Sequence, residues 1–147
     1  MTLAEKPAQL SWWHLWFREL LELPEAAVLL DDMGEDRVLV LVEEGRLRGV
    51  NIALSTKTRR EVRVWRYSIQ WLAECRRRQC QRPPAPAVDL LIPIHRPQLH
   101  FREVAQFLAC TERHVRNLAL DGRQYTERHN RVTRAALLTF LQTREIK

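Results

Sequence analysis

The chain has 147 residues, 46% of them hydrophobic and 29% charged, which suits one ordinary domain or two very small ones and excludes bulk disorder. Its formal net charge is +6, and 21 of its 24 basic residues are arginine. This balance favours an anionic partner, most often nucleic acid, because arginine forks onto phosphates and guanine edges. A GC-rich coding sequence would enrich arginine as well.

The charge is unevenly distributed along the chain. Residues 1–55 hold 5 basic and 10 acidic groups (net −5), residues 56–82 hold 9 and 2 (net +7), and residues 83–147 hold 10 and 6 (net +4). An acidic beginning and a basic middle indicate that different parts of the chain face different partners.

The localisation that we expect is cytoplasmic and nucleoid-associated. Three cysteines and an N-terminus without a signal-peptide pattern are typical of the reducing cytosol. The apolar stretch 12–30 contains three glutamates, which is too polar for a membrane span of about 20 apolar residues.

The first predicted element is a tryptophan-rich amphipathic helix within residues 1–22, with Ser11 as its cap. Its aromatic side chains form one wide apolar stripe, which needs cover from the chain itself, from a second copy or from a protein partner. The predicted stripe consists of Trp12, Trp13, Trp16 and Phe17.

A second helix is predicted to begin at Pro24, and the apolar run "VLVLV" (38–42) is predicted to be helical too. The alternative is a strand at 38–42 that pairs with "RLRGVNIAL" across a turn at Gly45. The segment "STKTRRE" (55–61) is predicted to be the tip of a basic hairpin that contacts DNA phosphates. The basic residues assigned to this contact are Lys57, Arg59, Arg60 and Arg63.

The proline-rich segment "QRPPAPAVDLLIP" (81–93) separates two halves that look alike. "EAAVLLD" begins at Glu25 and "EVAQFLA" begins at Glu103. Each half continues with a glycine, a basic stretch and a closing helix. We expect two copies of one unit, each of roughly fifty residues.

The second half is the clearer copy. One apolar face is predicted over a first helix, and Thr111 is predicted to cap a second helix that ends at Gly122. This order is typical of a helix-turn-helix. Residues 123–132 fit a small β-hairpin, and Thr133 caps a last helix. The predicted core residues are Phe101, Val104, Ala105, Leu108, Val115, Leu118, Ala119, Leu137, Phe140 and Leu141.

Residues 98–143 resemble the excisionase-like branch of the MerR-related winged-helix proteins. The resemblance rests on the order and spacing of "REVAQFLA", "TERHVRNLALDG", "RQYTERHNRVT" and "RAALLTFLQ". It implies that the second helix reads the major groove and that the hairpin wing contacts backbone or minor groove. The helix residues implicated are Arg113, His114, Arg116 and Asn117, and the wing residues are Arg123, Arg128, His129, Asn130 and Arg131. His100 departs from the family's Ser or Thr cap, so we expect a weaker cap.

The first half resembles the family in "EEGRLRGVNIAL" and "TKTRREVRVWRYSIQWL" but departs from it in the second helix. Aligning Gly45 with Gly122 places Asp36, Leu39 and Val40 where the second half has Arg113, Arg116 and Asn117. Such a surface repels phosphate and offers no donors to base edges. We expect this helix to have lost base reading.

No catalytic constellation and no cofactor site is predicted. The residues Cys75, Cys80, His95 and His100 have the spacing of a zinc finger, but prolines forbid the helix that would carry both histidines.

The sequence thus predicts a mainly α fold with small β-hairpin wings (α+β): tandem winged helix-turn-helix units after an N-terminal amphipathic helix. The predicted parts are the helix 1–22, a degenerate unit 23–80, a linker 81–97 and a DNA-reading unit 98–147. The expected function is sequence-specific binding of double-stranded DNA, in transcription regulation or as an excisionase-like architectural factor. The alternative is a protein–protein interaction module that uses the tryptophan stripe without binding DNA.

Overall fold

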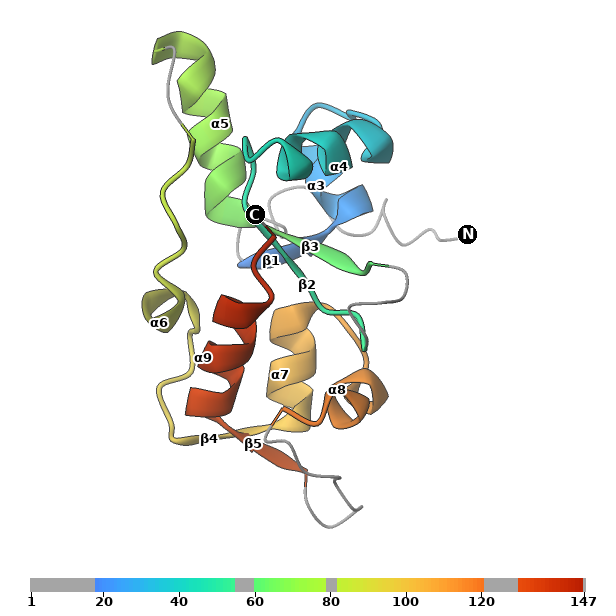
Figure 1. Ribbon diagram of the computed structural model, residues 1–147, viewed down its shortest axis with the longest axis vertical. Coiled ribbons are helices and arrows are strands. Elements are labelled where there is room, and N and C mark those ends of the chain that lie inside the picture. Colours follow the sequence, from blue (N-terminus) through green and yellow to red (C-terminus); the bar gives the residue numbers. More distant parts are fainter. Residues whose placement is uncertain (1–17, 55–59, 79–81, 121–129, 147) are drawn as a thin grey trace.

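The computed structural model describes residues 18–54, 60–78, 82–120 and 130–146 (Figure 1). Helices and short strands are interspersed along this part of the chain, and the strands form small antiparallel sheets, which is an α+β arrangement. The elements of the first half are β1 (Leu20–Glu22), α3 (Leu23–Leu29), α4 (Glu35–Glu43), β2 (Gly49–Asn51), β3 (Val62–Trp65) and α5 (Arg66–Arg78). They are followed by α6 (Val88–Leu91), β4 (Gln98–His100), α7 (Phe101–Leu108), α8 (Glu112–Leu118), β5 (Arg131–Thr133) and α9 (Arg134–Thr143).

A three-stranded antiparallel sheet in the order β1-β3-β2 forms the centre of the molecule. Strand β1 pairs with one edge of β3, with Leu20 opposite Trp65. Strand β2 pairs with the other edge, with Gly49 opposite Val64. The chain that follows α9 continues the sheet at the β2 edge, because Ile146 N donates to Gly49 O at 2.9 Å. The end of the described chain therefore belongs to the sheet of the first half.

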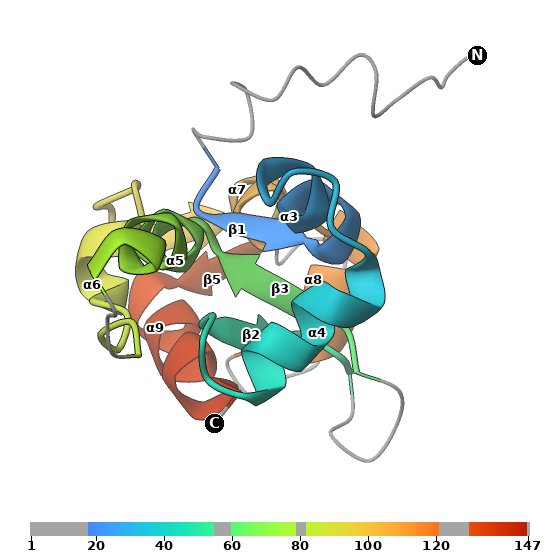
Figure 2. The same ribbon diagram turned by 90° about the horizontal axis from the view of Figure 1, so that it is seen from above.

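This sheet is buried on both faces. Leu21, Val62 and Val64 belong to one hydrophobic cluster with α3, α4 and α5. Leu20 and Trp65 point the other way and belong to a second cluster with α7 and α9. Figures 1 and 2 show the sheet between these two groups of helices. The central sheet thus contributes one face to each of the two hydrophobic clusters and joins the two halves of the chain.

The N-terminal helix was predicted to extend to residue 22, and this is wrong for its last three residues. Leu20–Glu22 form strand β1, in which Leu20 and Leu21 are both fully buried on opposite faces. Consecutive apolar residues fit a strand that is covered on both sides. Residues 1–17, including the rest of the predicted helix, lie outside the described residues.

The second sheet pairs β4 with β5, with Leu99 opposite Val132. Most of the hairpin predicted at 123–132 lies outside the described residues, and the described partner of β5 is β4, which was not predicted. Both central residues are fully buried against α7 and α9. The sheet therefore ties the start of α7 to the start of α9.

The proline-rich segment packs along the molecule. Val88 and Ile92 are buried in the cluster of the second half, and Arg48 of the first half donates to Pro83 O from both Nε (3.1 Å) and Nη2 (2.9 Å). Arg134 donates to Ile94 O at 2.9 Å. The segment predicted as a linker is therefore fixed to both halves over its described residues.

Residues 38–42 are helical, as predicted, and not a strand. Val38, Leu41 and Val42 are buried, whereas Val40 is 37% exposed, so α4 is an ordinary amphipathic helix. In the described part of the chain, no helix is long and apolar enough to span a bilayer.

Candidate nucleic-acid interface

Helices α7 and α8 form a tightly joined pair. The predicted core face of α7 is confirmed, since Phe101, Val104, Ala105 and Leu108 are all buried. The chain then turns at Ala109, which adopts the left-handed conformation (φ 56°). Thr111 caps α8 as predicted, because its hydroxyl accepts from His114 N at 3.1 Å.

Helix α8 ends earlier than predicted. Its last residue is Leu118, and Ala119 adopts a left-handed conformation (φ 46°) directly after it. The predicted end at Gly122 is therefore wrong, and Ala119 lies outside the helix. The helix ends because the backbone of Ala119 is left-handed, a conformation that more often falls on a glycine. Gly122 itself lies outside the described residues.

Packing of α8 divides its residues into an inner and an outer set. Val115 is fully buried in the core of the second half. Arg113, Arg116 and Asn117 are exposed, as the sequence predicted. Among the described residues, no carboxylate forms an ion pair with either arginine. Both side chains are exposed, and no ion pair within the described part of the chain occupies them, so they are available to an anionic ligand.

His114 differs from the prediction. It was expected on the outer side of α8, but its side chain is only 16% exposed and its Nε2 lies 2.6 Å from Ile52 O. Glu61 lies 3.6 Å from the same nitrogen. His114 therefore joins α8 to the first half instead of standing beside the exposed arginines.

The contact of His114 places the loop end of the β2–β3 hairpin beside the start of α8. Ile52 N donates to Glu61 O at 2.9 Å, which extends the strand pairing by one step. Asn51 Oδ1 accepts from Ala53 N (3.1 Å) and Glu61 N (3.0 Å) and so fixes both chains of the hairpin. Asn51 was not among the predicted site residues, although an amide side chain that bonds to nearby backbone is a common signal of such a turn.

Arg63 was predicted to contact phosphates, and the structure contradicts this. The residue is 8% exposed, and its guanidinium donates to Leu108 O (2.9 Å) and Ala109 O (2.8 Å) at the end of α7. Glu22 and Glu61 lie 3.8 and 4.0 Å away. Arg63 belongs to the central strand of a sheet covered on both faces, so its guanidinium is largely buried and is occupied by contacts within the protein.

The structure describes only some of the remaining candidates. Arg60 is exposed beside Glu43, with 3.4 Å between Nη1 and Oε2. Asn130 and Arg131 are exposed at the start of β5, and Asn130 O accepts from Phe101 N at 2.9 Å. The other predicted contacts lie outside the described residues, and so does the predicted partner stripe: Lys57, Arg59, Arg123, Arg128, His129, Trp12, Trp13, Trp16 and Phe17.

Helix α4 holds the position in the first half that α8 holds in the second. Gly34 and Thr111 are the N-caps, and Val38 and Val115 are the fully buried residues four positions later. This spacing places Asp36 in α4 at the position of Arg113 in α8. Asp36 is exposed, so the outer face of α4 is acidic where that of α8 is basic.

The helices that precede α4 and α8 share one capping arrangement. Glu25 Oε1 accepts from Glu22 N at 3.0 Å, and Glu103 Oε1 accepts from His100 N at 2.9 Å. Each glutamate also pairs with an arginine seven residues earlier, Arg18 or Arg96. The expected weakness at His100 is offset by Glu103, and the hydrogen bond from His100 N lowers the pKa of this carboxyl, with a smaller effect from Arg96.

Cys110 lies in the turn between α7 and α8. Burial raises the pKa of its thiol to about 11, although the nearby charge of Arg63 acts in the opposite direction. Such a thiol is almost fully protonated at neutral pH and is a weak nucleophile. In the described part of the chain, no cluster of three or more histidine, cysteine or carboxylate side chains could hold a metal ion.

No protein-family description, curated protein or solved structure matches this chain.

Proposed function

We propose that the protein binds double-stranded DNA in a sequence-specific manner through two tandem winged helix-turn-helix units. The second unit would insert α8 into the major groove, with Arg113, Arg116 and Asn117 facing the bases. Arginine suits guanine and asparagine suits adenine at the groove edge. The role we propose is that of a transcription regulator or an excisionase-like architectural factor.

One observation carries the proposal. Helix α8 buries Val115, while its outer face presents two arginines that have no ion-pair partner among the described residues. Packing of the core does not require two cations on that side, and exposed arginines beside an amide suit contacts with phosphates and base edges. The exposed Arg131 at the start of β5 adds positive charge at the same end of the molecule (Figure 1).

The first unit would support binding without reading bases. The repeated capping arrangement at Glu25 and Glu103 supports a common ancestry of the two units. The acidic face of α4 argues against groove insertion by the first unit. Its hairpin is held against α8 through His114 and Ile52, so Arg60 would approach the backbone of the same duplex.

Salt dependence of binding tests the proposal. If the interface neutralises about 5–8 phosphates, affinity for a labelled duplex should fall by orders of magnitude between about 50 and 200 mM salt. Fluorescence anisotropy measures this directly. The variant R113A/R116A should lose most of the affinity, while the matched control R37A, an exposed arginine on α4, should retain it. An affinity that does not change with salt would contradict DNA binding.

A further inference from the structure

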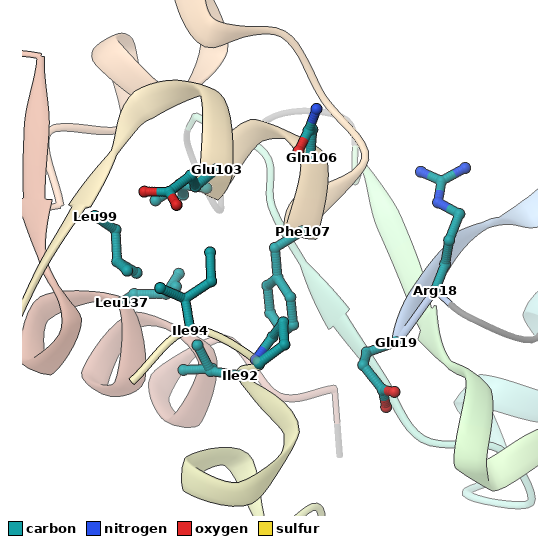
Figure 3. A pocket seen from close by; sticks show the side chains of 11 residues that line it. Arg18, Glu19, Ile92, Ile94, Leu99, Glu103, Gln106, Phe107 and Leu137 are labelled. Atoms are coloured by element: carbon teal, nitrogen blue, oxygen red, sulfur yellow. The ribbon is translucent and has the colours of Figure 1, made fainter. Parts of the chain in front are cut away.

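An apolar groove of about 180 Å³ lies between α7, the segment after α6 and the two residues that precede β1 (Figure 3). In Figure 3 the aliphatic side chains and the ring of Phe107 gather around it, from α7, α9 and the segment that follows α6. A cavity of about 150 Å³ is large enough to hold a benzene ring. The groove therefore has room for one aromatic side chain. Its apolar lining includes Ile92, Ile94, Leu99, Val104, Phe107 and Leu137.

The rim of the groove is polar, and one of its residues has a buried carboxylate oxygen without a hydrogen-bond partner among the described residues. Arg18, Glu19, Glu103 and Gln106 line it. Glu19 Oε1 accepts from Arg66 at 3.1 Å, whereas Glu19 Oε2 is buried without a hydrogen-bond partner among the described residues. A donor beside this carboxylate would satisfy an oxygen that is otherwise costly to bury.

The described chain begins at this rim. Arg18 is its first residue, and 17 residues precede it. Residue 16 is two positions away, within about 7 Å of Arg18 along an extended chain. The segment that ends here contains Trp12, Trp13 and Trp16, and leaving each in water forgoes a large burial energy.

We propose that the groove is the docking site of the chain's own Trp16. The indole matches the size of the groove and its apolar lining, and its N–H can donate to Glu19. Phe17 lacks such a donor. The short tether gives Trp16 an effective concentration in the millimolar range, which favours it over the same residue of a second copy. The tryptophan stripe would thus be anchored on the second half of the chain, away from α4.

A double-mutant cycle tests the docking. W16A should lower the melting temperature by roughly 5–10 °C, the range expected for the loss of one buried aromatic contact in a chain of this size. I94E should have a similar effect, and W16A should add almost nothing in the I94E background, since both remove one contact. The control L90E changes a 78% exposed leucine on α6 and should leave both the stability and the effect of W16A unchanged. Additive losses from W16A and I94E, or no effect of W16A, would overturn the proposal.

Two further measurements apply even if I94E fails to fold. Subtracting the emission spectrum of the conservative variant W16F from that of wild type isolates the emission of Trp16. This emission should be blue-shifted and protected from quenching by iodide, as for a buried indole. Emission typical of an exposed indole would overturn the proposal. Light scattering should give a monomer for both wild type and W16A. A wild-type dimer that becomes a monomer in W16A would assign the stripe to a second copy and overturn intrachain docking.

Discussion

Arg63 Nε donates a hydrogen bond to Leu108 O at 2.9 Å, so a side chain of strand β3 satisfies a carbonyl at the C-terminal end of α7. The same guanidinium reaches Ala109 O at 2.8 Å. Carbonyl groups at a helix end lack intrahelical donors, and a cation is favourable there. This contact fixes the position from which α8 departs and thereby links the central sheet to the candidate DNA surface.

Removal of the Arg63 side chain should destabilise the fold without a direct effect on DNA contacts. R63A should lower the free energy of unfolding by about 2–4 kcal/mol, because the carbonyls of Leu108 and Ala109 lose a charged donor. Urea denaturation measures the difference. R60A, which removes an exposed arginine, should cost less than about 1 kcal/mol. Equal effects of the two changes would show that the Arg63 contacts carry little stability.

His114 should contribute to stability and not to base preference. H114A removes the contact with Ile52 O and should lower the free energy of unfolding by about 1–2 kcal/mol. At a temperature where the variant is folded, its ranking of duplex sequences should match that of wild type. A changed ranking of duplex sequences with unchanged stability would show that His114 contacts bases from the outer face of α8.

Ionisation of Glu103 should make the free energy of unfolding depend on pH. Its folded pKa is lowered, first by the hydrogen bond from His100 N, so its contribution is fully present above the unfolded pKa of about 4.3. It is lost as pH falls through the lower folded pKa. Wild type should therefore lose more stability than E103Q between pH 7 and pH 3. Parallel acid-unfolding curves would contradict this contribution.

Cys110 should react slowly with alkylating agents. Because burial raises its pKa to about 11, its alkylation rate in C75S/C80S should still rise about tenfold per pH unit from pH 8 to pH 10. The same variant in denaturant should react faster at pH 8 and level off near the ordinary thiol pKa. A native rate that levels off in that range would mean that the thiol is exposed.

The second half was the more predictable part of the chain. Thr111 and Thr133 cap α8 and α9 as predicted, because capping depends on a hydroxyl and the amides within one turn of it. The buried face of α7 follows from a spacing of three and four residues. These signals are local, so one sequence is enough to detect them.

The errors arose where distant segments decide the structure. Leu20 and Leu21 continue a helical pattern in the sequence, but pairing with β3 makes them a strand. Arg63 belongs to a basic stretch and is nevertheless buried, because its strand is central in the sheet. His114 turns inward because Ile52, 62 residues earlier, offers it a carbonyl. Such contacts have no signature within a window of ten residues, although the valines on either side of Arg63 indicate a buried strand.

Selection of bound sequences from a random duplex pool tests the central claim most directly. Wild type should enrich a defined site, and R116A or N117A should each relax preference at one or two base pairs, at a cost of about 1–3 kcal/mol. R60A should weaken all sequences about equally, since a phosphate contact carries no base information. A pool that shows no enrichment would contradict sequence-specific binding. A preference altered by R60A but not by R116A or N117A would contradict the assignment of base reading to α8.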